Sequence, residues 1–205
     1  MNDIKIIDEF ERAIAKYTGS KYGVAVSSCT NAIFLSLQYL KYIGELKEGT
    51  TIIIPSRTYH SVPCTLKNCG LNISFEDIFW DGCYLIYPTR VWDSAVRFTK
   101  GMFVGGNNLQ CISFQYRKHI KMGRGGMILT DDEDAVRWLK QARFNGRHEN
   151  ISKFDDELEI CGWSMYMLPE EAARGLTLFN LVPEDNPDCG GSEDYPDLSK
   201  QKVFK

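Results

Sequence analysis

Short β-prone runs alternate with segments of helical periodicity along this chain, and no other feature constrains its fold as much. Apolar residues recur every three or four positions from Ile7 to Tyr17, which predicts an amphipathic helix over residues 4–18. A β-prone run at 22–26 then leads through a small polar turn into a second periodic segment at 32–43. Strands interleaved with helices predict an α/β fold with substantial parallel pairing.

The same alternation continues to about residue 181. Further strands are expected at 51–54, 73–76, 84–87, 91–92, 110–114 and 126–130, and further helices at 58–68, 133–144 and 169–181. The last helix opens at Pro169, a favourable residue for a first helical turn. The runs at 84–87 and 91–92 stand too close together for a helix between them.

The composition changes at Val182. From there the chain is rich in acids, proline and glycine and poor in apolar residues, which is typical of an extended or partly ordered segment. We therefore expect one compact domain over residues 1–181 and a C-terminal tail over residues 182–205. A chain of 205 residues is long enough for one sizeable domain of this kind.

Charge and hydropathy exclude several classes of partner. The formal net charge is −3 and the basic residues are scattered, so nothing favours binding to nucleic acid. No run approaches the roughly 18 apolar residues of a membrane span, and the first residues lack the apolar core of a secretory signal, so no membrane association and a cytoplasmic location are expected. The seven cysteines include no Cys-x-x-Cys pair, which favours reduced core cysteines over a metal site.

A small polar turn, Ser-Ser-Cys-Thr-Asn at 27–31, stands between the first strand and the second helix. Backbone N–H groups at a helix N-terminus attract anions, so this turn is a candidate phosphate site. An ordinary N-cap is the alternative.

Asp93, Lys118 and a glycine-rich run complete the candidate site. Asp93 ends the run at 91–92, at the edge where α/β sheets place ligands, although a turn aspartate is the plainer interpretation. The segment Ser-Phe-Gln-Tyr-Arg-Lys puts Ser113 and Lys118 on one loop, where Lys118 taken alone is typical of a surface lysine. Gly-Arg-Gly-Gly at 123–126 permits positive φ or close backbone approach, or forms a plain turn.

Taken in order, these motifs resemble the DegT/DnrJ/EryC1/StrS family of PLP-dependent sugar aminotransferases. Seven family motifs have similar segments here, in the same order. Residues 28–31 are similar to Ser-Gly-Thr-Ala, 55–59 to Pro-Ser-x-Thr-aromatic, 92–95 to Glu-Asp-Ala-Ala and 113–118 to Ser-Phe-x-x-x-Lys. Residues 123–126 are similar to Gly-Glu-Gly-Gly, 162–167 to Gly-aromatic-Asn-x-x-Met and 171–176 to Gln-Ala-Ala-x-Gly-Leu. The resemblance covers about residues 8–180. An accidental match of this extent is improbable, so the resemblance outweighs the plainer interpretations given above.

The resemblance implies a PLP-transferase-like α/β fold of the aspartate-aminotransferase large-domain type, truncated so that the family's C-terminal domain is missing. Its sheet is expected to be mixed, mostly parallel and flanked by helices. The implied cofactor is pyridoxal 5'-phosphate (PLP), with Lys118 forming the Schiff base and acting as base in the proton shift. Asp93 would hold the protonated pyridine nitrogen, and Tyr59 would stack on the ring. The phosphate would be held by Ser28, Cys29, Thr30 and Ser113.

The implied activity is transfer of an amino group, from glutamate or a similar amino-acid donor, to a nucleotide-sugar substrate that carries a keto group. A homodimer is expected, because the family builds its site across a two-fold interface. Some family members are sugar dehydratases with histidine at the lysine position; here lysine stands at 118 and histidine follows at 119, which favours transamination. The alternative is a non-catalytic protein that keeps the fold for binding or assembly and is completed by a partner chain.

Departures from the family fall within the motifs, and one of them is Ser164 in place of an asparagine. Cys29 replaces a glycine, which a phosphate turn tolerates only if the φ angle of that residue is negative. Arg124 replaces a glutamate and puts a positive charge beside the expected site. That charge either helps to bind an anionic substrate or marks a surface that no longer does chemistry.

Overall fold

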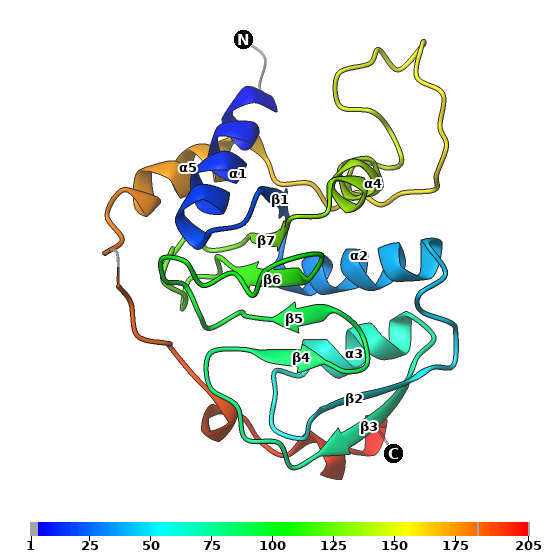
Figure 1. Ribbon diagram of the computed structural model, residues 1–205, viewed down its shortest axis with the longest axis vertical. Helices are drawn as coiled ribbons and strands as arrows, with labels where there is room; N and C mark the ends of the chain where they lie inside the picture. The colour runs from blue at the N-terminus through cyan, green and yellow to red at the C-terminus, as the bar shows by residue number, and fades with distance from the viewer. Residues whose placement is uncertain (1–3, 184, 205) are drawn as a thin grey trace.

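A five-stranded sheet in the order β1-β7-β6-β5-β4 runs through the computed structural model, which describes residues 4–183 and 185–204 (Figure 1). Its strands are β1 (Tyr22–Val26), β4 (Tyr84–Ile86), β5 (Val91–Asp93), β6 (Leu109–Ser113) and β7 (Gly126–Thr130). A second, two-stranded sheet is formed by β2 (Thr51–Pro55) and β3 (Asn72–Glu76). Ile53 and Tyr87 exchange backbone hydrogen bonds of 2.8 and 3.2 Å, which join this pair to the end of β4.

Strand pairing is mixed. β5 pairs with β6 and β2 with β3 in parallel, whereas β1 with β7, β6 with β7 and β4 with β5 are antiparallel. The mixed α/β fold is therefore confirmed, with parallel pairing in two of these five strand pairs rather than in most of them. A parallel pair needs a crossover of about a dozen residues or more, and the link from β4 to β5 is shorter than that. These two strands consequently form an antiparallel hairpin.

Helices cover both faces of the five-stranded sheet (Figure 1). They are α1 (Ile4–Thr18) and α5 (Pro169–Phe179) on one face and α2 (Cys29–Tyr42) and α4 (Glu133–Arg143) on the other, while α3 (Ser61–Asn68) packs against α2 and β3. The apolar core is divided by the sheet, because successive strand residues point to opposite faces. In β7, Met127 belongs to the cluster under α1 and α5, and Ile128 belongs to the cluster under α2 and α4. Each helix and strand expected from the sequence is present, with ends displaced by at most three residues.

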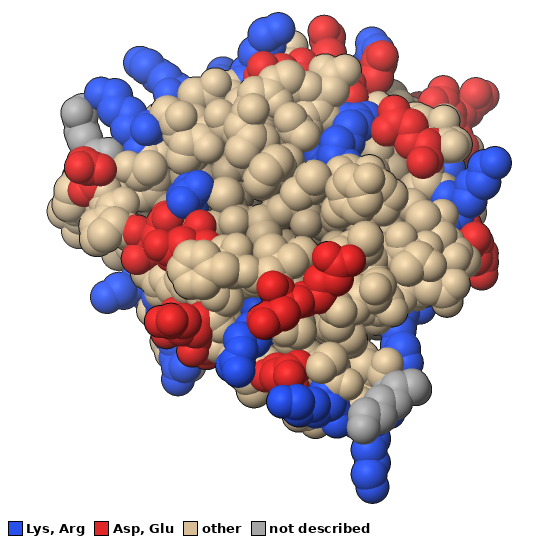
Figure 2. All heavy atoms as spheres, turned by 60° about the horizontal axis from the view of Figure 1, so that its bottom comes forward, with Lys and Arg blue, Asp and Glu red and all other residues tan. Residues whose placement is uncertain are grey.

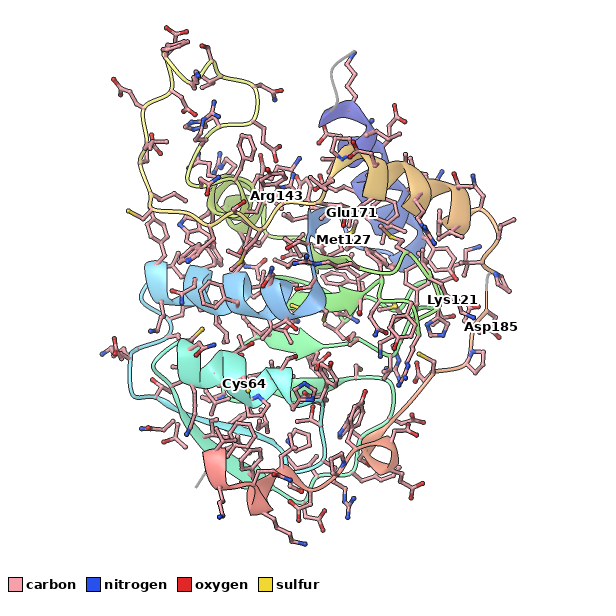
Figure 3. The ribbon with its side chains drawn as sticks, turned by 180° about the vertical axis from the view of Figure 1, so that it is seen from behind. Cys64, Lys121, Met127, Arg143, Glu171 and Asp185 are labelled. Atoms are coloured by element: carbon pink, nitrogen blue, oxygen red, sulfur yellow. The ribbon has the colours of Figure 1, made fainter. Side chains whose placement is uncertain are left out.

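A buried ion pair caps the free edge of β1. Glu11 of α1 accepts the Ala25 N–H at 2.8 Å, and Arg143 at the end of α4 donates to the Ala25 carbonyl at 2.6 Å (Figure 3). Arg143 also pairs with Glu11 and, at 2.6 Å, with Glu149. An unpaired strand edge exposes backbone donors and acceptors that attract other strands, and here side chains satisfy them. The arrangement also fixes the strand that leads into the turn at 27–31.

The C-terminal tail packs against the domain instead of leaving it. In Figure 1 it descends from α5 along one side of the sheet and ends beside β3. The 3-10 turn Leu198–Lys200 buries Leu198, which is 4% exposed. The Phe204 ring lies 5.8 Å from the Phe75 ring of β3.

The cysteines differ from expectation in their burial. All seven are free thiols, but only Cys29, Cys69 and Cys111 are buried, while Cys64, Cys161 and Cys189 are exposed. Cys64 lies on the outer side of α3 because that helix is amphipathic and buries Val62 and Leu66 instead (Figure 3). Among the described residues, no three His, Cys, Asp or Glu side chains gather as a metal ion would require. No helix in the same residues combines the length and apolar character needed to cross a membrane.

Candidate functional site

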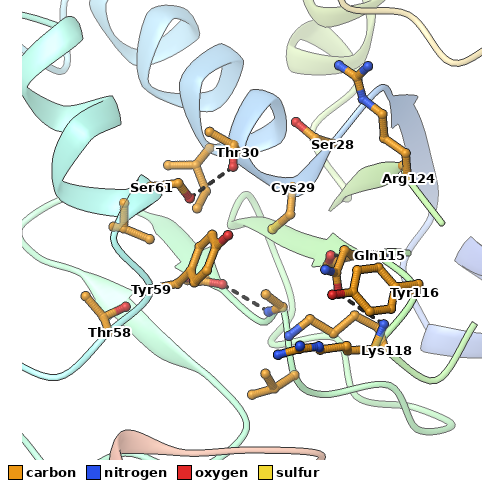
Figure 4. Close-up of a pocket in the computed structure, with 18 of the residues that line it drawn as sticks. Ser28, Cys29, Thr30, Thr58, Tyr59, Ser61, Gln115, Tyr116, Lys118 and Arg124 are labelled. Atoms are coloured by element: carbon orange, nitrogen blue, oxygen red, sulfur yellow. Dashed lines mark hydrogen bonds between the residues drawn. The ribbon is translucent and has the colours of Figure 1, made fainter. Parts of the chain in front are cut away.

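A pocket of about 380 Å³ opens where the N-termini of α2 and α3 face the end of β5 and the loop between β6 and β7 (Figure 4). Sites for small molecules typically occupy roughly 300–1,000 Å³, so this pocket has room for one such ligand. A site beyond the end of a sheet strand is where α/β proteins commonly bind ligands.

The α2 N-terminus supplies a polar part of the pocket. Ser28 is the N-cap, and its hydroxyl accepts the Asn31 N–H at 3.1 Å. The amides of Cys29 and Thr30 belong to the first helical turn, which offers them no carbonyl within the helix, so they are open to an anion. Among the described non-glycine residues only Asn145 has a positive φ. Cys29 therefore has the negative φ that a phosphate turn requires of a residue that replaces glycine. The turn therefore combines an N-cap with a candidate phosphate site.

Gly126 allows β7 to approach this turn closely. A Cβ atom at Gly126 would lie 2.4 Å from the Cys29 nitrogen and 2.4 Å from the carbonyl carbon of Ser28. No side chain fits there unless the turn moves. The preceding Gly125 has a φ of +128°, which other residues rarely adopt. The glycine-rich run thus provides both features expected of it, positive φ and close backbone approach.

Asp93 is held inside the pocket at 6% exposure. One carboxylate oxygen accepts the Ala95 N–H at 3.0 Å, and the other accepts the Tyr84 hydroxyl, also at 3.0 Å. The Tyr84 oxygen lies 2.5 Å from the Thr58 hydroxyl, which completes a buried network. Burial raises the pKa of Asp93 above its usual value, while the hydrogen bonds from Ala95 and Tyr84 and the charge of Lys118 oppose the rise. A cationic group placed beside this carboxylate would favour its ionised form.

Lys118 reaches into the same pocket from the loop after β6 (Figure 4). Its backbone N–H donates to the Gln115 carbonyl at 2.8 Å, which turns the chain at this point. In the part of the chain that the structure describes, its amine has no hydrogen bond or ion pair and so is available to a ligand. The neighbouring His119 is not part of the lining, since its Nε2 pairs with the Pro187 carbonyl at 2.8 Å.

All the residues that the family resemblance assigns to the cofactor line this one pocket. They are Ser28, Cys29, Thr30, Tyr59, Asp93, Ser113 and Lys118. Tyr59 is 49% exposed. The Ser113 hydroxyl accepts the Gln115 N–H at 3.4 Å. The structure brings these residues together, and the role of each remains a prediction.

Several pocket residues carry no assignment from the sequence. Ser61 at the start of α3 accepts a hydrogen bond of 3.0 Å from Thr30, and so ties the two helix ends together. Trp80 and the tail residue Tyr195 line the wall, and Tyr84 lies behind Asp93. These residues lie outside every motif, and nothing in the sequence marks them as part of a site.

The charge of the lining favours an anionic ligand. Lys118, Arg117 and Arg124 contribute positive charge, and Asp93 is the single acidic residue of the described lining. Arg124 donates from Nε to the Ser27 carbonyl at 3.1 Å, which places it beside the turn. On the face shown in Figure 2, by contrast, charges of both signs are interspersed.

Comparison with known proteins relates this chain to one family. The family model described as DegT/DnrJ/EryC1/StrS aminotransferase family matches residues 3–104 and 97–185. The spore coat polysaccharide biosynthesis protein SpsC of Bacillus subtilis (strain 168) is 26% identical over 219 residues, covering 83% of this chain and 55% of that protein. GDP-perosamine synthase of Caulobacter vibrioides is 24% identical over 221 residues, covering 88% of this chain and 58% of that protein.

Solved structures show the same fold. The E. coli GDP-4-keto-6-deoxy-D-mannose-3-dehydratase with bound hydrated PLP gives a TM-score of 0.70 at 22% identity, covering 85% of this chain and 60% of that one. The chain spans little more than half the length of the curated relatives named here. Because the family model matches nearly all of the sequence up to residue 185, the chain belongs to the DegT/DnrJ/EryC1/StrS aminotransferase family.

Proposed function

We propose that this chain is a PLP-dependent aminotransferase for a nucleotide-linked keto-sugar, with Lys118 as the residue that holds the cofactor. One observation carries the proposal: the Lys118 amine, the buried Asp93 carboxylate and the first-turn amides of α2 converge on a single pocket. These three groups are complementary to the aldehyde, the pyridine nitrogen and the phosphate of PLP, respectively.

The residues present fit this cofactor. The amides of Cys29 and Thr30, with the Ser113 hydroxyl, would bind the phosphate. Asp93 would pair with the protonated pyridine nitrogen, which offsets the cost of keeping that carboxylate ionised in a dry pocket. The half-exposed ring of Tyr59 would stack on the cofactor ring.

Each group would then do a defined task. When bound, the cofactor supplies an electron sink for the reacting amino group. Asp93 would accept a hydrogen bond from the protonated pyridine nitrogen, and Tyr84 and Ala95 fix the two carboxylate oxygens for this role. Lys118 would hold the cofactor through Nζ, and its amine would serve as the general base that moves the proton.

The substrate class follows from the relatives and from the lining. One relative is named for polysaccharide biosynthesis and another for making GDP-perosamine, which supports a nucleotide-linked keto-sugar as the amino acceptor. The positive charge of Arg117 and Arg124 suits a substrate that carries phosphate, and an amino acid such as glutamate would be the donor. Transamination is favoured over dehydration because Lys118 faces the pocket and His119 is engaged by the tail.

A cytoplasmic homodimer is part of this proposal. Family members build their site across a two-fold interface, so a second copy of the chain would complete the substrate side of the pocket. Light scattering of the purified protein tests this part independently of activity, and a monomer at all concentrations would contradict it.

The half-reaction with the amino donor tests the function. PLP-loaded protein is mixed with glutamate in the absence of a sugar, and 2-oxoglutarate is measured. We expect a stoichiometric amount from the wild type and none from Lys118→Ala. PLP binding without formation of the corresponding 2-oxo acid, from glutamate or from any other amino-acid donor, would contradict aminotransfer and favour the non-catalytic binding module.

A further inference from the structure

Tyr195, in the C-terminal tail, lines the pocket although it lies far from the motif residues in the sequence. Its ring stacks on Trp80 with centroids 5.8 Å apart and planes inclined by 24°. Trp80 in turn lies 4.9 Å from the ring of Tyr84, whose hydroxyl is bonded to Asp93. A continuous row of aromatic side chains therefore leads from the tail to the carboxylate of the site.

The tail is anchored on both sides of Tyr195. Before it, Asp188 forms an ion pair of 2.6 Å with Arg97, whose Nε also donates to the same carboxylate. After it, the Leu198 N–H donates to the Ser56 carbonyl at 2.8 Å, and the Leu198 side chain is buried. Tyr195 is thus held in the pocket wall by backbone and charge contacts that do not depend on its own ring.

The ring and the hydroxyl of Tyr195 remain available to a ligand. Its ring centroid lies 6.4 Å from that of Tyr59, the residue expected to stack on the cofactor. Its hydroxyl makes no hydrogen bond to any residue that the structure describes. Burial, followed by the charge of Asp93, raises the pKa of Tyr195 to about 12, so the hydroxyl is a neutral donor at physiological pH.

We infer that Tyr195 is a binding residue for the planar pyridine ring of the cofactor and shares that ring with Tyr59. The inference deepens the proposed function and depends on it. Aromatic side chains bind planar rings through offset or edge contacts, and Tyr195 lies between Tyr59 and the aromatic residues that support Asp93. The tail is then a part of the active site, and this chain supplies that part itself.

Binding of pyridoxamine 5'-phosphate, measured by calorimetry, tests the inference without any contribution from covalent attachment to Lys118. In Tyr195→Leu the dissociation constant should rise roughly 3- to 10-fold, the range expected for loss of one aromatic contact. Tyr195→Phe keeps the ring and should bind within about twofold of the wild type. Tyr42→Leu is the matched control, because Tyr42 packs on Trp138 at 5.5 Å outside the pocket and should leave the affinity unchanged.

The outcomes separate the two proposals. Equal affinities in the wild type and Tyr195→Leu would overturn the inference alone, and a lowered melting temperature at unchanged affinity would show a packing role only. No binding by the wild type would overturn the proposed function and this inference with it. If Tyr195→Leu does not fold, hydrogen exchange of the wild type decides: amides around 191–198 should gain protection when pyridoxamine 5'-phosphate binds, and unchanged exchange would overturn the inference.

Discussion

Tyr84 and Asp93 face each other across the β4–β5 hairpin, and the Tyr84 hydroxyl donates a hydrogen bond of 3.0 Å to the Asp93 carboxylate. Directly opposed residues of an antiparallel pair project to the same face of the sheet, so the register of the hairpin creates this contact. The short link between β4 and β5 therefore has a functional consequence. It brings a phenol to the carboxylate that we propose as the partner of the pyridine nitrogen.

Removal of the Tyr84 hydroxyl is expected to weaken the fold and the site together. Tyr84→Phe leaves one buried oxygen of Asp93 and the Thr58 hydroxyl without their partner. A hydrogen bond to a charged group contributes about 1.5–3 kcal/mol, so urea unfolding should show a loss in that range. Tyr42→Phe, at an exposed residue, should change the free energy of unfolding by less than about 0.5 kcal/mol. Equal values for the two variants would show that the network does not support Asp93.

Asp93→Asn should reverse its effect between the free and the PLP-bound protein. The pKa of Asp93 is higher in the folded protein than in the unfolded chain. Without cofactor, the wild type therefore loses stability as the pH rises from the unfolded-state pKa of about 3.9 through the folded-state pKa. The asparagine side chain of the variant does not titrate, so Asp93→Asn should become the more stable protein toward neutral pH. With PLP present, the variant should bind about 10-fold or more weakly, because a hydrogen bond to a charge is lost. Denaturant titrations across pH, with and without PLP, measure the change in stability and the change in PLP affinity. Parallel curves of stability against pH for the two proteins would contradict the expected gain in stability of Asp93→Asn.

Gly126→Ala is expected to damage the phosphate turn specifically. The new Cβ would clash with the Ser28–Cys29 backbone, and strain of this kind costs about 1–3 kcal/mol. The turn must shift, so the affinity for PLP should fall as well. Gly44→Ala is the control, because Gly44 has a φ of +79° and nothing within 4 Å of its added Cβ. Gly44→Ala should lose stability but keep its affinity for PLP. Equal PLP affinities in Gly126→Ala and Gly44→Ala would argue against a phosphate site at this turn.

Arg143→Met should destabilise the protein more than most single substitutions. It leaves Glu11, which is 4% exposed, and the edge of β1 without their cation, and breaking a buried pair in this way costs about 3–5 kcal/mol. Arg137→Met removes an exposed pair with Asp134 and should cost at most about 1 kcal/mol. Chemical denaturation measures the loss of stability in both variants. Lys140 also pairs with Glu11, at 3.0 Å, so a small effect at Arg143 would mean that Lys140 alone satisfies this carboxylate.

The local structure and the motif residues could be predicted from the sequence because they depend on short-range patterns. Periodicity located α1 and the strands, and Ser28 and Asp132 are N-caps whose side chains accept from the first turn of their helices. The resemblance of the motifs to the family identified Asp93 and Lys118, which lie at the end of β5 and in the loop after the parallel strand β6.

Long-range pairing could not be predicted in the same way. The short link between β4 and β5 accounts for their antiparallel direction, but it does not show that this hairpin lies beside β6 in the sheet. Tyr195 lies more than a hundred residues from Trp80, and its acidic, proline-rich surroundings predicted only an extended or partly ordered tail. Its position depends on anchors such as the Arg97–Asp188 ion pair, which only the folded chain brings together.

The covalent attachment of PLP to Lys118 tests the central claim most directly. The wild type and the variants Lys118→Ala and Lys121→Ala are incubated with PLP and reduced with borohydride, which makes any link between PLP and a lysine permanent, and the labelled peptide is located by mass spectrometry. We predict label on Lys118 in the wild type and in Lys121→Ala, and none in Lys118→Ala. Label on another lysine, or no label at saturating PLP, would contradict the account.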